Sequence, residues 1–181
     1  MNKIHPFTVI HEDAEIGQNV TIWQFAAVLK GAKIGNNVSI GMCAEIGAGS
    51  EVGEGTRISR NVFFPSNSKV GKNCFFGPHC CFADDRYPVA NNPSYLAEPP
   101  IIEDDVSVGM NATILPGVRL GKGCRVGAGA IVTRNVLPGQ HVRGEPARAK
   151  AYSGIHHQEF HELAVPSALV ADKNDSHLQP V

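Results

Sequence analysis

The chain has 181 residues, 43% hydrophobic and 18% charged, which suffices for one ordinary core and leaves little for a second domain. Sixteen basic and seventeen acidic residues give a net charge of −1, so neither a nucleic-acid-binding excess of cations nor a disordered acidic chain is expected. No run reaches signal-peptide length or the roughly 18 apolar residues of a membrane span, so we expect a cytoplasmic protein without a membrane partner.

A hydrophobic residue recurs every six positions in the first half of the chain. Because an α-helix repeats every 3.6 residues, this period favours short strands of alternating facing, separated by bends. Three such hexads make about one turn of a triangular coil, so residues eighteen apart should stack in columns. The recurring residues are Ile4, Ile10, Ile16, Ile22, Val28, Ile34, Ile40, Ile46, Val52, Ile58, Phe64, Val70, Phe76 and Phe82.

The five cysteines are odd in number and lack paired C-x-x-C spacing, which argues against a disulfide framework and a zinc ribbon. Cys74, Cys80 and Cys124 occupy the fifth hexad position, where small or β-branched residues recur. We therefore expect them to be reduced core residues.

The repeat breaks once. A second run follows the break, giving twenty hexads in all, with its recurring residues at Ile102, Val108, Ile114, Leu120, Val126 and Val132. The step from Phe82 to Ile102 is 20 residues, which is not a multiple of six, so residues 83–101 should protrude as a loop. Long insertions in compact domains are usually functional, although this one could instead pack against a neighbouring subunit.

The C-terminal part departs from the repeat. We expect the coil to occupy residues 1–136, a cap with a short helix near residues 154–164 to occupy 137–166, and a disordered tail to occupy 167–181. His157 and His161 are four residues apart on the expected helix but lack a third firm ligand, so no metal site is predicted.

The hexads, the Ile-Leu-Pro-Gly-Val segment at 114–118, the Gly-Ala-Gly-Ala-Ile-Val-Thr segment at 127–133 and the Gly-Glu-Pro-Ala segment at 144–147 resemble coenzyme A-dependent hexapeptide acyltransferases. The period alone does not set the handedness; the resemblance implies an all-β, left-handed parallel β-helix of about six to seven triangular coils. It also implies a homotrimer with active sites between subunits. Acetyl-coenzyme A, or a longer acyl-coenzyme A, would be the cosubstrate and would lie between adjacent coils.

The start of the loop, Phe82 to Pro88, resembles the Phe-x-Asn-Asp-x-Tyr-Pro loop of nucleotide-sugar N-acyltransferases. Asp85, Tyr87 and Pro88 match, whereas Asp84 stands where that family has Asn, near the sugar amine. The resemblance implies acetylation of the amino group of a UDP- or dTDP-linked aminosugar, for example in the synthesis of lipopolysaccharide or another cell-surface polysaccharide.

Transfer of an acyl group from a thioester to an amine needs a positioned amine, an acceptor for its proton and stabilisation of an oxyanion. Asp84 is the first candidate to hold, and to deprotonate, the amine. His79 is the second candidate, since its ordinary pKa lies near neutrality, and a surface or interface histidine is the alternative reading.

Three neighbouring loop residues are candidates for binding the acceptor. Asp85 and Tyr87 would contact sugar hydroxyls, and Arg86 would meet the pyrophosphate. The competing interpretation is that an Arg-Asp pair only fixes the loop.

The candidates for coenzyme A lie later in the chain. Gly127 and Gly129 would let the pantetheine approach backbone amides, and Arg143, Arg148 and Lys150 would meet the phosphates.

Trp23 and Phe25 are large aromatic residues at positions where the neighbouring hexads have small residues. They would either stack on a base or pack between subunits, and packing is the favoured interpretation.

Two other functions remain open. An O-acetyltransferase would need stronger general-base help, so His79 would matter more than Asp84. A non-catalytic hexapeptide scaffold is the non-enzyme alternative.

Overall fold

The computed structural model describes residues 1–144 and the backbone of residues 148 and 149. These residues belong to one compact unit, Met1–Ala151; the second unit, Tyr152–Val181, lies outside the described residues. The expected helix, the tail, the histidine cluster and Lys150 therefore fall outside the described part.

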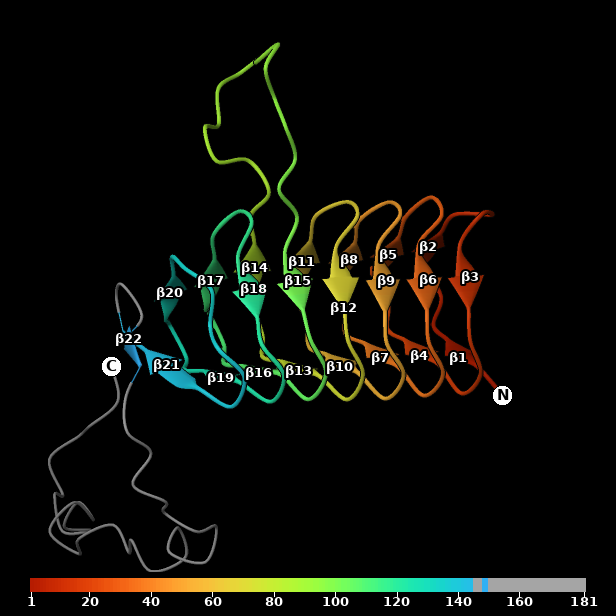
Figure 1. Cartoon of the computed structure of the whole chain (residues 1–181). Coiled ribbons are helices and arrows are strands. Elements are labelled where there is room, and N and C mark those ends of the chain that lie inside the picture. The colour runs from red at the N-terminus through yellow and green to blue at the C-terminus, as the bar shows by residue number, and fades with distance from the viewer. Residues whose placement is uncertain (145–147, 150–181) are drawn as a thin grey trace, which may run out of the picture. The chain divides into compact units, whose positions relative to one another are not determined.

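Every hexad forms one two-residue strand, and the recurring hydrophobic residue is its second residue. The strands stack in parallel into three faces (Figure 1). Face A contains β1 (Lys3–Ile4), β4 (Thr21–Ile22), β7 (Ser39–Ile40), β10 (Arg57–Ile58), β13 (Phe75–Phe76), β16 (Ser107–Val108), β19 (Arg125–Val126), β21 (His141–Arg143) and the antiparallel β22 (Arg148–Ala149). Face B contains β2 (Val9–Ile10), β5 (Ala27–Val28), β8 (Glu45–Ile46), β11 (Phe63–Phe64), β14 (Cys81–Phe82), β17 (Thr113–Ile114) and β20 (Ile131–Val132). Face C contains β3 (Glu15–Ile16), β6 (Lys33–Ile34), β9 (Glu51–Val52), β12 (Lys69–Val70), β15 (Ile101–Ile102) and β18 (Arg119–Leu120).

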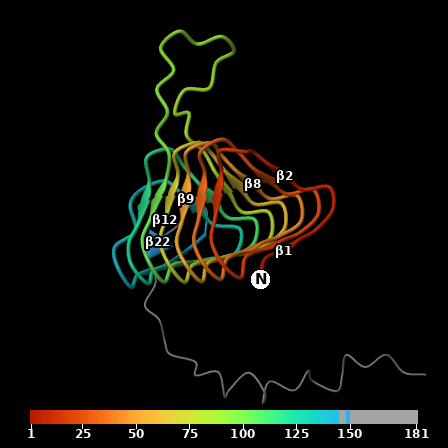
Figure 2. The ribbon, with the colours of Figure 1, turned by 90° about the vertical axis from the view of Figure 1, so that its right-hand side faces the viewer.

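The coil is left-handed. Figure 2 looks onto it from its N-terminal end: the chain passes from β1 at the base to β2 on the right, over the top, and down the side of β9 and β12 on the left. It thus turns counter-clockwise as it recedes from the viewer, in agreement with the strand directions in Figure 1. The handedness implied by the resemblance is confirmed.

The predicted columns form the core. Ile4, Ile22, Ile40 and Ile58 are register partners along face A, and Phe76 follows them. From the second turn onward the inward residues are buried, while Ile4 is 47% exposed because no turn precedes it. Each turn therefore depends on its neighbours to cover its apolar side chains.

The cysteines behave as expected. All five are free thiols, and Cys74, Cys80 and Cys124 are buried. Burial disfavours the thiolate and raises the pKa of Cys80 and of Cys124 to about 12, so these thiols are unreactive core groups at neutral pH.

The faces meet at three edges. The AB edge comprises residues 5–8, 23–26, 41–44, 59–62, 77–80, 109–112 and 127–130; the BC edge and the CA edge follow faces B and C in the same way. Along the AB edge, from Cys43 onward, the third residue of each corner donates its backbone N–H to the second residue one turn earlier, as in His79 N to Arg60 O at 3.1 Å; Phe25 N donates instead to Phe7 O at 3.1 Å. This pattern keeps the corners aligned.

The coil extends further than the hexads indicate. Val136 bridges to Leu120, and β21 pairs in parallel with β19, so stacking continues beyond residue 136 to Arg143 and gives about eight turns rather than six to seven. At the loop, Ile101 pairs with Lys69 as the first residue of β15, so the insertion ends at Pro100 and not at residue 101. Among the described residues, no helix is long and apolar enough to cross a membrane.

Candidate functional site

The loop of residues 83–100 projects from the BC edge between β14 and β15 (Figures 1 and 2). Across it, the register partners Cys81 and Thr113 are 32 positions apart, whereas Phe63 and Cys81 are the usual 18 apart. The coil thus continues in register on both sides of an insertion.

An ion pair closes the base of the loop. Arg86 donates from Nε to Oε1 of Glu98 at 2.8 Å and from NH2 to Oε2 at 2.6 Å, and also from NH2 to the carbonyl oxygen of Pro116 at 3.0 Å. The hydrogen bond from Arg86 lowers the pKa of the Glu98 carboxyl group below its ordinary value. Arg86, expected to meet a pyrophosphate, is therefore engaged in fixing the loop, with Glu98 in place of the expected aspartate.

Asp84 lies at the same base. Its Oδ2 accepts a hydrogen bond from the Tyr95 hydroxyl at 2.9 Å, which raises the pKa of Tyr95, and its backbone oxygen accepts from the Glu98 amide at 2.8 Å. The second carboxylate oxygen of Asp84 makes no hydrogen bond or ion pair among the described residues and remains available to an amine. Asp85 caps its own turn by accepting from the Tyr87 amide at 2.9 Å, and Tyr87 is 74% exposed.

His79 lies on a different edge. It sits on the AB edge before β14, with φ of 60°, and its exposed ring has no hydrogen-bond or ion-pair partner among the described residues. Asp84 follows five positions later along the chain, on the BC edge, and five steps of extended backbone span roughly 15 Å. One copy of the chain therefore does not bring the two candidate catalytic residues together.

The glycines expected near coenzyme A lie on the AB edge, two turns beyond His79. Their amides are already used: Gly127 N donates to Val142 O and Gly129 N to Met110 O, both at 2.8 Å. Gly127 is needed because a Cβ there would lie 2.9 Å from the Cβ of Arg143, and Gly129 has a positive φ. The backbone geometry of the coil thus accounts for both glycines. A pantetheine bound here would pack against an edge without protruding side chains and would find no free backbone amides at Gly127 and Gly129.

Two of the three expected cations are neighbours. Arg143 of β21 and Arg148 of β22 are register partners in an antiparallel pair. The sequence predicted this clustering from their proximity along the chain.

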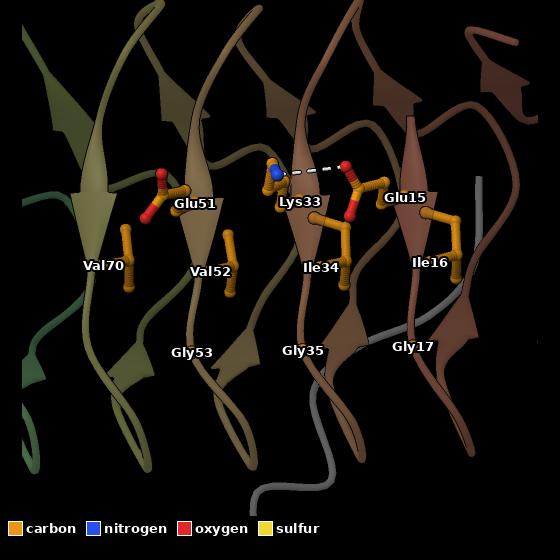
Figure 3. Close-up of a pocket in the computed structure, with 10 residues that line it drawn as sticks. All are labelled: Glu15, Ile16, Gly17, Lys33, Ile34, Gly35, Glu51, Val52, Gly53 and Val70. Atoms are coloured by element: carbon orange, nitrogen blue, oxygen red, sulfur yellow. Dashed lines mark ion pairs between the residues drawn. The ribbon is translucent and has the colours of Figure 1, made fainter. Parts of the chain in front are cut away.

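A separate hollow of about 430 Å³ lies on face C (Figure 3). Its rim carries Glu15, Lys33 and Glu51, and Lys33 Nζ lies 3.0 Å from Glu15 Oε1. Glu51 is in turn paired with Lys69 at 2.6 Å. Because these charges pair with one another, the hollow offers no free ionic group to a ligand, and it lies away from the loop and the AB edge.

Sequence reasoning missed Glu98, because nothing in a non-repeating loop indicates which residue meets Arg86. It singled out Phe25 on the AB edge but missed Phe7, which stands one turn earlier in the same hexad position, a position mostly filled by Asn or Gly.

Residues 13–48, 31–66 and 99–134 match the family model described as bacterial transferase hexapeptide, six repeats. A curated relative, 2,3,4,5-tetrahydropyridine-2,6-dicarboxylate N-acetyltransferase of Staphylococcus aureus, is 51% identical over 79 residues, 44% of this chain and 30% of the relative. The chain thus matches less than a third of the length of that protein.

Three solved structures share the fold. A hexapeptide-repeat acetyltransferase of Vibrio cholerae with acetyl-coenzyme A has a TM-score of 0.53 at 25% identity, covering 62% of this chain and 69% of that one. PerB of Caulobacter crescentus, solved with coenzyme A and GDP-perosamine, has a TM-score of 0.52 at 22% identity over 83% and 57% of the two chains. The acetyltransferase domain of PglB from Neisseria gonorrhoeae has a TM-score of 0.53 at 20% identity over 83% and 58%.

Proposed function

The chain belongs to the bacterial transferase hexapeptide family, and from that premise we propose that it transfers an acetyl group from acetyl-coenzyme A to the amino group of a UDP- or dTDP-linked aminosugar. The observation that carries the proposal is the single interruption of an otherwise continuous coil by a clamped loop with an available carboxylate oxygen on Asp84. Use of acetyl-coenzyme A and of a nucleotide sugar would suit a cytoplasmic enzyme.

Two similarities support the donor and the reaction type. The Vibrio cholerae relative was solved with acetyl-coenzyme A, and the Staphylococcus aureus relative is named an N-acetyltransferase. The acceptor is proposed from the loop, whose Asp85, Tyr87 and Pro88 match nucleotide-sugar N-acyltransferases. A tetrahydropyridine dicarboxylate is the competing acceptor, since it is in the name of the curated relative.

In the proposed reaction the amine nitrogen attacks the thioester carbonyl carbon, the C–S bond breaks, and an amide and the coenzyme A thiol are formed. The amine loses one proton, which passes to His79 or directly to the departing thiolate. A carboxylate is a weak base, so Asp84 would serve mainly to orient the amine. Positioning of this kind is worth up to about 7 to 11 kcal/mol in favourable cases.

We further propose that the working form is a homotrimer with sites between copies. His79 and Asp84 lie on different edges of one coil, so a neighbouring copy that sets its loop against the AB edge would complete the site. Coenzyme A would then extend from His79 past Gly127 and Gly129 towards Arg143 and Arg148, with Lys150 following in sequence.

O-acetylation is the second candidate, because His79 is exposed and unpartnered and so is available to take a hydroxyl proton. The test follows thiol release from acetyl-coenzyme A with a panel of acceptors: UDP- and dTDP-aminosugars, the matching hydroxyl sugars, and tetrahydropyridine dicarboxylate. We expect release only with the aminosugars, and an acetamido product by mass spectrometry. Release with a hydroxyl sugar or the dicarboxylate alone would replace the proposed acceptor, and no release with any acceptor would favour a scaffold.

A further inference from the structure

The AB edge carries residues that a coil corner does not need. The third position of each corner has positive φ, a conformation that is costly for bulky side chains and easy for Gly and Asn. In the described part, the residues with positive φ are Gly, Asn or Asp, with four exceptions. The exceptions are Phe7, Phe25, Cys43 and His79, with φ of 64°, 63°, 56° and 60°, and all four lie on the AB edge. Strain kept along one edge indicates that these side chains are retained for a purpose other than folding.

The first two turns of this edge form an aromatic platform, defined as His5, Phe7, Trp23 and Phe25. The rings of Phe7 and Phe25 stack with centroids 5.8 Å apart, and those of His5 and Trp23 with centroids 4.5 Å apart. Phe7, Trp23 and Phe25 are 77%, 43% and 59% exposed. Rings held parallel to one another and open to solvent can stack on a further flat ring.

Gln24, which stands between Trp23 and Phe25 in the sequence, carries an unsatisfied polar atom. Oε1 of Gln24 is enclosed and has no hydrogen-bond partner. A buried acceptor without a donor is uncommon, and a turn of the Gln24 side chain outward to the N–H group of a bound ring is one way to satisfy it. Uracil and thymine both carry such a group.

A cation and His79 follow the platform along the same edge. Arg60 is exposed, forms no ion pair among the described residues, and receives the backbone hydrogen bond of His79. Phe25 and His79 are three turns apart, about 14 Å at the usual spacing of paired strands. This is on the order of the distance from the base to the sugar ring in an extended nucleotide sugar.

We infer that the AB edge is the binding track for the nucleotide of the acceptor: the base stacks on the aromatic platform, the diphosphate lies beside Arg60, and the sugar amine reaches His79. The inference rests on the proposed function for the identity of the acceptor. It assigns roles to Trp23, Phe25 and Arg60, and it makes Arg60, rather than the clamped Arg86, the partner of the diphosphate.

Trp23 is the sole tryptophan of the chain, so its fluorescence reports on this edge directly. Titration of the intact protein with UDP and with dTDP should quench or shift this emission saturably. Phe25→Asn removes the ring and installs the residue that Asn61 and Asn111 already provide in the same column, so the variant should fold. We expect it to weaken nucleotide binding about tenfold to a hundredfold, and Arg60→Gln to weaken it as well. Phe63→Ser, an exposed ring on face B, is the matched control and should leave binding unchanged.

Kinetics then separate this inference from the proposed function. Phe25→Asn should raise KM for the nucleotide-linked aminosugar and spare turnover of the corresponding aminosugar 1-phosphate, which lacks the base. Suppose that the wild type acetylates the nucleotide sugar, but that Trp23 fluorescence does not change with nucleotide and Phe25→Asn does not change KM. The proposed binding track is then wrong and the proposed function stands. If the nucleotide binds as described and no aminosugar is acetylated, the track stands and the function fails. If Phe25→Asn only dissociates the oligomer, the platform is an interface between copies and the inference is overturned.

Discussion

Arg86 and Glu98, twelve residues apart in the chain, form a two-pronged ion pair that closes the base of the loop. Both prongs are charge-assisted hydrogen bonds in fixed planar geometry, which is the strongest arrangement available to such a pair. The pair therefore sets the direction in which the loop leaves the BC edge.

Arg86→Lys keeps the positive charge but cannot form both hydrogen bonds to Glu98. We predict that it lowers kcat/KM for the acceptor between about tenfold and a hundredfold, because a displaced loop misplaces the amine. The melting temperature should change little, because the pair is solvent-exposed and the coil does not depend on it. Steady-state kinetics and a thermal melt on one preparation check this. Unchanged kinetics would show that the loop is positioned by other contacts.

The same pair predicts a pH dependence of loop opening. The pKa of Glu98 is lower in the folded loop than in the unfolded chain. The stabilisation of the closed loop by the ion pair is therefore fully present above the unfolded pKa and is lost as the pH falls through the folded pKa. Protease sensitivity of the loop should therefore be low near neutrality and rise in acid, below the ordinary glutamate range of about 4.3. Glu98→Gln should remove this acid transition, and a transition that persists in the variant would assign it to another group.

The loop is also anchored by the core beneath it. Phe82, the last residue before the loop, stacks on Phe64 with centroids 4.6 Å apart and meets Phe76 edge-on at 5.6 Å. Phe82→Ala should cost about 3–5 kcal/mol in the free energy of unfolding, measured with denaturant. Phe75→Ala, on the outer side of face A, should cost far less. Equal losses would contradict the burial that distinguishes the two rings.

The proposed path of coenzyme A predicts a defect confined to one edge. Gly129 and Gly123 both have φ of +66° with open space around them, on the AB and CA edges respectively, so Asn fits either position. Gly129→Asn should raise KM for acetyl-coenzyme A severalfold, because its side chain would occupy the track. Gly123→Asn should leave it unaltered, and equal behaviour of the two variants would argue for a different path.

The two candidate catalytic residues make opposite predictions. Asp84→Asn should retain substantial activity with an aminosugar, because an amide can still orient an amine. His79→Ala should lose most activity, by about 10²-fold or more, if histidine accepts the proton. Measured turnover at saturating substrate decides between them, and an unaffected His79→Ala would leave the thiolate as the proton acceptor.

The sequence predicts the repeating part of this molecule well and the non-repeating part poorly. Ile22, Val28 and Ile34 each predict the same inward-facing strand position, so the twenty hexads are twenty consistent indications of one fold. The Arg86 to Glu98 pair has no such redundancy, since it depends on how one loop folds back. β21 escaped detection because residues 137–141 interrupt the hexad spacing although Val142 still stacks on Val126.

The candidate site divides in the same way. Residue type and position identified Asp84 and His79, but only the coil geometry shows that they stand on different edges. The sequence singles out Trp23 and Phe25 of the aromatic platform but not Phe7. The positive φ of Phe7 and Phe25, at a hexad position mostly filled by Asn or Gly, is evident only from the structure.

Mixing two inactive variants tests most directly the claim that the site is built from the AB edge of one copy and the loop of another. His79→Ala and Asp84→Ala subunits, unfolded and refolded together, would form mixed assemblies in which about a quarter of the sites pair an intact His79 with an intact Asp84. We predict that acetyl transfer to the nucleotide-linked aminosugar recovers to about that fraction of the wild-type rate in the mixture and in neither variant alone. A mixture no more active than its components would contradict a shared site and place the chemistry within a single coil.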